Sequence, residues 1–157
     1  MKLPSFFWCT VANVQTVLVV DDDELLARMI SEFLVGKGFH VWTARDGLQG
    51  YSSYRRCQTE MVVTDIEMPQ LDGFDMMRCI RTINPSVKTI YMSAAPTQYR
   101  GALIMEAQKF AAATLRKPFV GMELLNILLS ASDKVTPVLP RYELSGDEKK
   151  LVWKEAG

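Results

Sequence analysis

The sequence predicts an α/β protein built on a doubly wound, five-stranded parallel sheet with strand order 2-1-3-4-5. Five short apolar runs alternate with five stretches of helical periodicity between residues 16 and 131. The first run, Thr16–Val20, is apolar and β-branched, which is typical of a strand buried on both faces. Right-handed crossovers leave few arrangements of such units, and this order is common at this chain length.

The first half of the chain predicts three strands and two helices. The strands are Thr16–Val20, His40–Ala44 and Met61–Thr64. Asp23 and Asp46 are placed to cap the two helices. The first helix carries an apolar stripe and ends near Gly36 and Gly38; the second runs to about Arg56. The residues expected to face inward are Leu25, Leu26, Met29, Ile30, Phe33 and Leu34, followed by Leu48, Tyr51 and Tyr54.

The second half predicts two strands and three helices. Pro69 and Asp72-Gly73 mark a loop, and Asn84-Pro85 ends the helix that follows it. The strands are Val87–Met92 and Ala112–Arg116. The helices are expected over Phe74–Ile83, over Gln98–Lys109 and from Leu124 to about Ala131.

The length of 157 residues fits one domain, residues 16–132, with short extensions. Residues 1–15 are expected to be a leader; Pro4 and Asn13 interrupt its likeness to a secretory signal, and no cleavage motif follows. Residues 133–157 are expected to be a linker with a short helix, because Ser145 and Glu148 fit a capping box that opens towards Trp153. No stretch approaches the roughly 20 apolar residues of a membrane-spanning helix.

The composition excludes several classes of function. Lys and Arg number 18, as do Asp and Glu, so no general attraction to nucleic acid or anionic membrane is expected. The three cysteines are widely spaced, which suits reduced thiols in a cytoplasmic protein better than disulfides or a zinc site. His40 is the only histidine, which excludes a His-rich metal cluster.

Polar residues follow four of the five predicted strands. Asp21 and Asp22 follow the first, Asp65 the third, Ser93 the fourth and Lys117 the fifth. The carboxyl ends of parallel strands share one sheet edge, so these side chains are expected to converge there. Clustered carboxylates repel unless a cation sits among them, and Mg²⁺ is the oxygen-preferring ion for such a site. A carboxylate can also accept a phosphoryl group, whose oxygens a lysine and a hydroxyl can hold.

Each of these residues has an alternative interpretation when taken alone. Asp23 and Glu24 favour a helix start over a role as metal ligands, because acids are stabilised at that end of the helix dipole. Ser93 alone would be a loop residue and Lys117 a surface charge. Asp72-Gly73 suits a turn. Only the joint occurrence of acids, hydroxyl and lysine at the strand ends favours a functional site.

Four motifs resemble those of response-regulator receiver domains, in order and at the expected spacing. They are Val17-Leu18-Val19-Val20-Asp21-Asp22, Val63-Thr64-Asp65-Ile66-Glu67-Met68-Pro69 with Leu71-Asp72-Gly73, Tyr91-Met92-Ser93-Ala94, and Leu115-Arg116-Lys117-Pro118-Phe119. The resemblance covers about Thr16 to Ala131. It implies the flavodoxin-like receiver fold.

The resemblance also implies roles for single residues. Asp65 would be the phosphoacceptor, and Asp22 and Asp65 would bind Mg²⁺ directly. Asp21 would do so largely through water, and the backbone carbonyl of Glu67 would complete the metal site. In the family, a serine or threonine hydroxyl and a lysine bind the phosphoryl oxygens, and the bond after that lysine is commonly cis. Ser93 and the Lys117-Pro118 pair occupy those positions.

The implied partners are a sensor histidine kinase or phosphotransfer protein and an unknown downstream protein. The domain would catalyse only its own phosphorylation and dephosphorylation, without acting as an enzyme on a separate substrate. Residues 133–157 are too few for an output module. Signalling through protein contact is therefore expected, with no direct binding of nucleic acid or membrane and with a homodimer left open.

One position departs from the family pattern. An aromatic residue that acts as a switch often stands three residues before the lysine, where this chain has Thr114. We therefore expect activation to act through Ser93 and the loop after it, with Tyr91 or Tyr99 as candidates to fill the space beside Thr114. The segment from Ser93 to Lys117 is also slightly longer than usual.

Three alternatives to a working receiver are kept. A degenerate receiver would keep the fold as a binding module without phosphorylation. A flavodoxin-type flavin protein would need a loop rich in Ser, Thr and Gly after the first strand, where this chain has Asp21-Asp22-Asp23-Glu24. A haloacid-dehalogenase-like phosphatase would carry its nucleophile on the first strand in a D-x-D pattern, with a cap insertion that does not stand out here.

Overall fold

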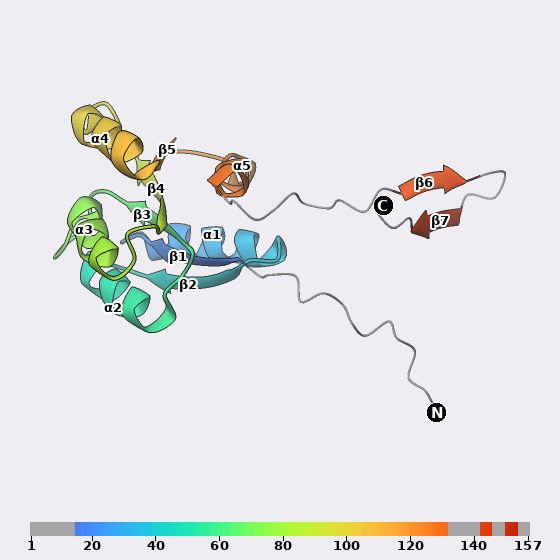
Figure 1. Ribbon diagram of the computed structural model, residues 1–157, viewed down its shortest axis with the longest axis horizontal. Helices are drawn as coiled ribbons and strands as arrows, with labels where there is room; N and C mark the ends of the chain where they lie inside the picture. Colours follow the sequence, from blue (N-terminus) through green and yellow to red (C-terminus); the bar gives the residue numbers. More distant parts are fainter. Residues whose placement is uncertain (1–14, 132–141, 146–149, 154–157) are drawn as a thin grey trace.

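The computed structural model describes residues 15–131, 142–145 and 150–153. Its main sheet is parallel and has the strand order β2-β1-β3-β4-β5, as predicted (Figure 1). The strands are β1 (Thr16–Val20), β2 (His40–Ala44), β3 (Met61–Asp65), β4 (Lys88–Ser93) and β5 (Ala113–Arg116). The predicted ends of the five strands differ from these by at most one residue.

Five helices alternate with the strands and cover both faces of the sheet. They are α1 (Glu24–Gly36), α2 (Gly47–Cys57), α3 (Gly73–Ile83), α4 (Arg100–Phe110) and α5 (Gly121–Ala131). One core cluster joins α1 and α5 to Val17 and Val19 of β1. The other joins α2, α3 and α4 to Leu18 and Val20, so successive strand residues serve opposite faces.

Aspartate side chains begin three of the helices. Asp23 accepts hydrogen bonds from the backbone N–H groups of Leu25 and Leu26, which confirms it as the cap of α1. Asp46 caps α2 in the predicted way, and Asp72 caps α3. Helix α4 differs, because the residue before it, Tyr99, makes no side-chain capping bond.

The predicted inward faces of α1 and α2 are partly wrong. Leu25 is 61% exposed, Met29 57% and Leu48 53%. The buried face of α1 is Ala27, Ile30 and Leu34, a narrower stripe than the predicted one. In α2 the buried positions include Gly47, Gly50 and Tyr54; the glycines bring the helix close to its neighbours, and Leu48 falls outside this face.

The expected helix towards Trp153 is wrong. The structure has β6 (Tyr142–Ser145) paired antiparallel with β7 (Lys150–Trp153). Leu151-Val152-Trp153 is rich in strand-favouring side chains, and Gly146 disfavours a helix. The leader at residues 1–14, the linker at 132–141 and Glu148 lie outside the described residues. In the described part of the chain no helix has both the length and the apolar character needed to cross a membrane.

Two glycines bring helices against the loop after β3, residues 66–72. A Cβ on Gly73, the first residue of α3, would lie 2.3 Å from the carbonyl oxygen of Asp65. A Cβ on Gly47, the first residue of α2, would lie 2.1 Å from the carbonyl oxygen of Leu71. Both distances are far below van der Waals contact, so only glycine fits. The starts of α2 and α3 thus enclose residues 66–72, the Asp65 loop, which follows Asp65 and carries Glu67.

Candidate functional site

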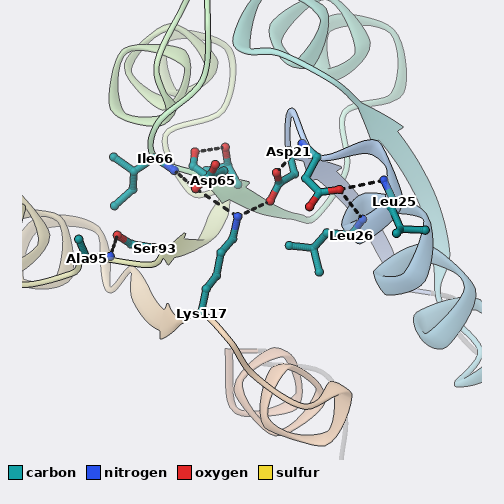
Figure 2. Close-up of polar contacts among 10 residues, drawn as sticks. Asp21, Leu25, Leu26, Asp65, Ile66, Ser93, Ala95 and Lys117 are labelled. Carbon is teal, nitrogen blue, oxygen red and sulfur yellow. Dashed lines mark hydrogen bonds and ion pairs between the residues drawn. The ribbon is translucent and has the colours of Figure 1, made fainter.

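The carboxyl ends of the strands bring the predicted polar residues to one edge of the sheet (Figure 2). Asp21 and Asp22 follow β1, Asp65 ends β3, Ser93 ends β4 and Lys117 follows β5. The expected convergence is confirmed for the acids and the lysine by their contacts. The chemical role of each residue stays a prediction.

Three carboxylates form a potential cation site. Asp21, Asp22 and Asp65 each offer an oxygen, and these oxygens all lie within 4.8 Å of one another. Asp21 is fully buried, Asp65 is partly buried and Asp22 is exposed, so the group opens to solvent on one side. Three hard oxygen donors around one point fit Mg²⁺. The predicted part of the Glu67 backbone carbonyl in this site stays untested.

Among the described residues, Lys117 is the cation that faces this group. Its Nζ lies 2.7 Å from Oδ2 of Asp21 and 3.5 Å from Oδ1 of Asp65. Burial alone would lower the pKa of Lys117, but hydrogen bonding to Asp21 and the charges of Asp21 and Asp65 outweigh it and raise that pKa. The lysine is therefore a positive charge at neutral pH. The peptide bond after it, Lys117–Pro118, is cis, as the resemblance implied.

The electrostatics single out Asp65 among the acids. Burial raises the pKa of Asp65 to about 6, with the charge of Asp21 adding to the effect and Lys117 opposing it. Its Oδ1 accepts a hydrogen bond from the backbone N–H of Ile66 at 2.9 Å. When ionisation of a carboxylate is unfavourable in its site, a cation bound beside it stabilises the ionised form. The cluster therefore carries more negative charge than Lys117 balances.

Ser93 lies at the end of β4 and is buried. Its Oγ accepts a hydrogen bond from the backbone N–H of Ala95 at 3.0 Å. A hydroxyl that accepts one bond can still donate its own proton to another oxygen. Ser93 is thus tied to the start of the β4–α4 loop while it keeps a donor for a ligand.

A pocket of about 530 Å³ opens beside the acids. It is lined by Asp22, Ile66, Glu67, Met68, Pro69, Asp72, Phe74 and Tyr99. The Tyr99 hydroxyl donates a hydrogen bond to Oε1 of Glu67. Sequence reasoning did not place Phe74 or Tyr99 in this wall. Phe74 directly follows Asp72-Gly73 of the second motif, which was the available signal for it, whereas no motif pointed to Tyr99 as part of this wall.

A second polar cluster lies between α3 and α4 and was also missed. Nη2 of Arg81 lies 2.7 Å from Oε2 of Glu106 and donates to Oγ1 of Thr89 at 3.3 Å. Tyr91, fully buried on β4, donates its hydroxyl proton to the same Glu106 oxygen at 2.7 Å. The Arg81 guanidinium also stacks 3.7 Å from the Phe110 ring centroid. Thr114, opposite Tyr91 in the sheet register, is exposed.

Comparisons with known proteins agree on one family. A family model for the response regulator receiver domain matches residues 17–129. The chemotaxis protein CheY of Thermotoga maritima is 32% identical over 105 residues, which are 66% of this chain and 85% of CheY. The probable transcriptional regulatory protein TcrX of Mycobacterium tuberculosis is 37% identical over 79 residues, which are 50% of this chain and 34% of TcrX.

Solved structures lead to the same family. The receiver domain of the sensor histidine kinase PA1611 from Pseudomonas aeruginosa PAO1 is 29% identical, with a TM-score of 0.66. The match covers 74% of this chain and 96% of that domain, whose structure has a magnesium ion coordinated in the active site cleft. This chain spans only 34% or less of the length of three curated transcriptional regulators that it matches, TcrX among them.

Proposed function

Because this chain belongs to the family of response regulator receiver domains, we propose that it accepts a phosphoryl group on Asp65. The observation that carries this proposal is the group of three carboxylates at the carboxyl edge of the sheet, faced by the single ammonium of Lys117. Receiver domains are regulatory domains of two-component systems. The donor proposed here is a sensor histidine kinase or a phosphotransfer protein.

The proposed transfer forms one bond and breaks another. An oxygen of Asp65 attacks phosphorus in line, the bond from phosphorus to the donor's imidazole nitrogen breaks, and that nitrogen keeps the electron pair. In the described contacts Oδ1 of Asp65 is held by the Ile66 N–H and faces Lys117. Oδ2 is therefore the oxygen available for attack. Lys117 offsets charge that develops on the phosphoryl oxygens, and the Ser93 hydroxyl donates a hydrogen bond to one of them.

The same residues fit a magnesium ion. Asp22 and Asp65 would bind it directly, Asp21 largely through water, and the Glu67 carbonyl would complete the set. When bound, the ion supplies positive charge that offsets repulsion between these acids and an incoming phosphoryl group. The fit rests on the donor chemistry, since all three side chains present hard oxygens and their net charge exceeds what Lys117 balances.

The proposed signal leaves through protein contact. A phosphoryl group on Asp65 would draw the Ser93 hydroxyl towards it. The loop after Ser93 would follow, because the backbone N–H of Ala95 donates a hydrogen bond to that hydroxyl. The surface of α4 would then change its equilibrium between two arrangements. The downstream partner is proposed to be a protein, with no direct contact to nucleic acid or membrane.

Intact mass spectrometry with acetyl phosphate tests this function. We expect wild-type protein to gain one phosphoryl group in the presence of Mg²⁺ and Asp65→Asn to gain none. Asp75→Asn is the matched control, because Asp75 is an acid of α3 that pairs with Arg78 and stands apart from the cation group. Mg²⁺-dependent incorporation that persists in Asp65→Asn would contradict the assignment. A folded wild-type protein that gains no group would instead indicate a degenerate receiver.

A further inference from the structure

Glu67 stands two residues after Asp65, yet its side chain lies outside the cation group of Asp21, Asp22 and Asp65. Its carboxylate oxygen Oε1 accepts a hydrogen bond from the Tyr99 hydroxyl. Tyr99 comes from the far side of the pocket, where the β4–α4 loop ends. One hydrogen bond therefore joins the Asp65 loop to the start of α4 across the pocket wall.

The backbone and ring of Tyr99 are held independently of Glu67. The N–H of Tyr99 donates to the Pro96 carbonyl at 3.2 Å, and its own carbonyl accepts from the N–H of Leu103 at 2.9 Å. The Tyr99 ring centroid lies 6.0 Å from that of Phe74. The hydroxyl is therefore fixed relative to the start of α4. Glu67 has a flexible, exposed side chain and is the partner that is held.

Two nearby acids have partners of their own, whereas Asp22, which also lines the pocket, belongs to the cation group. Asp72 accepts the N–H of Asp75 at 2.8 Å as the cap of α3, and Asp21 pairs with Lys117. A glutamate has two side-chain methylene groups, so a free Glu67 carboxylate could rotate towards the cation group. A fourth acid there would strengthen cation binding and repel an anionic phosphoryl donor.

We propose that Tyr99 is a positioning residue for this site, because its hydroxyl holds the Glu67 carboxylate against the outer pocket wall and away from the cation group. The inference rests on the proposed function for its effect on phosphorylation, but not for its effect on cation binding. Tyr99 thereby sets the number of carboxylates that face the cation at three. It also leaves the approach to Asp65 free of a further negative charge.

Tyr99→Phe is the direct variant, since it keeps the ring beside Phe74 and removes only the hydroxyl. We expect the Mg²⁺ dissociation constant to fall about three- to tenfold, which matches the net contribution of one ordinary solvent-accessible hydrogen bond. We expect phosphorylation by acetyl phosphate to slow by a similar factor. Tyr51→Phe is the matched control, because Tyr51 lies on α2, is partly buried and does not line this pocket.

A double-mutant cycle with Glu67→Gln separates this role from a merely structural one. Isothermal titration with MgCl₂ is carried out on wild type, Tyr99→Phe, Glu67→Gln and the double variant. Glutamine cannot bring a negative charge to the cation, so the effect of Tyr99→Phe should vanish in that background. A dissociation constant that is unchanged in Tyr99→Phe would overturn the proposal. An equal change in both backgrounds would also overturn it, because the ring or α4 would then be responsible.

The cycle also distinguishes failure of this inference from failure of the proposed function. The titration uses no phosphoryl donor. Mg²⁺ binding that follows the expected cycle, together with no phosphorylation of wild type, would support the role of Tyr99 and contradict the function. Normal phosphorylation of wild type, together with equal Mg²⁺ binding in all four proteins, would support the proposed function and contradict the role of Tyr99.

Discussion

The cluster at the strand ends and the cluster between α3 and α4 use the same kinds of side chain with opposite charge balance. At the strand ends, Asp21, Asp22 and Asp65 face one ammonium, that of Lys117. Between α3 and α4, Arg81 faces one carboxylate. The first group keeps an excess of negative charge beside an open pocket. The second is neutral as a pair, is mostly buried and lies beside a smaller pocket of about 310 Å³.

This difference in charge balance distinguishes a candidate binding site from an ion pair that holds two helices together. A buried pair with matched charge and further hydrogen bonds, like the pair at Glu106 with the Tyr91 hydroxyl, has no excess charge for a counterion to offset, and it joins the helices that it lies between. A cluster with excess charge in a hollow is more stable when a counterion arrives. Phe74 lies between the second cluster and the wall of the pocket beside the first, because its ring centroid is 4.9 Å from that of Tyr91 and 6.0 Å from that of Tyr99.

The largest effect on stability is expected from breaking the Arg81–Glu106 pair between α3 and α4. Glu106→Ala leaves the Arg81 guanidinium and the Tyr91 hydroxyl buried without their carboxylate. We expect the free energy of unfolding to fall by about 3 kcal/mol, the lower end for a broken buried pair, because the glutamate is partly exposed. Urea denaturation measures it. Glu32→Ala is the control, since its pair with Arg28 lies on the surface and should contribute less than about 0.5 kcal/mol.

Removing a negative charge from the cluster at the strand ends should stabilise the protein. Because the pKa of Asp65 is raised from its ordinary value of 3.8 to about 6, its ionisation opposes folding; this cost grows from about pH 4 and is complete above about pH 6. Asp65→Asn should therefore raise the free energy of unfolding of metal-free protein by about 1–2 kcal/mol at pH 7, discounted for water that reaches the carboxylate. The gain should disappear below about pH 4, where Asp65 is protonated in both states. A loss of stability at pH 7 would contradict the unbalanced charge.

Adding a cation should sharpen the contrast. At a free Mg²⁺ concentration ten times the dissociation constant, binding to the native state should raise the free energy of unfolding of wild type by about 1.4 kcal/mol. Asp22→Ala should lose most of this response, while Glu106→Ala should keep it despite a lower starting stability. Thermal melts with and without MgCl₂ measure the three proteins. Equal responses of wild type and Asp22→Ala would show that the ion binds elsewhere.

The smallest effect is expected at Thr114. It is exposed on β5 and belongs to neither cluster, so Thr114→Ala should change stability by less than about 0.5 kcal/mol. Hydrogen exchange with beryllofluoride, a phosphoryl mimic, should give the same protection changes in the Ser93–Lys109 region as in wild type. A variant that loses those changes would place the switch at position 114 after all.

The fold could be predicted from local signals that act at short range. The apolar run Thr16–Val20 and the capping residues Asp23 and Asp46 fix element type and helix starts. The convergence of Asp21, Asp65 and Lys117 followed from parallel topology alone. These features depend on backbone geometry, which sequence patterns report directly.

Features that depend on side-chain packing could not be predicted. Leu25 and Leu48 fit a helical stripe by spacing, yet their exposure is set by how closely each helix approaches the sheet. Tyr99 meets Glu67 across 32 residues of sequence, and Glu106 meets Tyr91 across 15. No local pattern connects such residues, because each contact depends on where another helix or loop comes to rest.

The glycine contacts at the Asp65 loop have a consequence for where this domain can move. Gly73 and Gly47 leave no room for a methyl group against the carbonyl oxygens of Asp65 and Leu71, so residues 66–72 are wedged between two helix starts. The opposite wall has no such wedge: α4 starts without a side-chain cap and meets the loop through Tyr99. We therefore expect a change in the shape of the pocket to move α4 together with Tyr99, while the backbone of residues 66–72 stays in place.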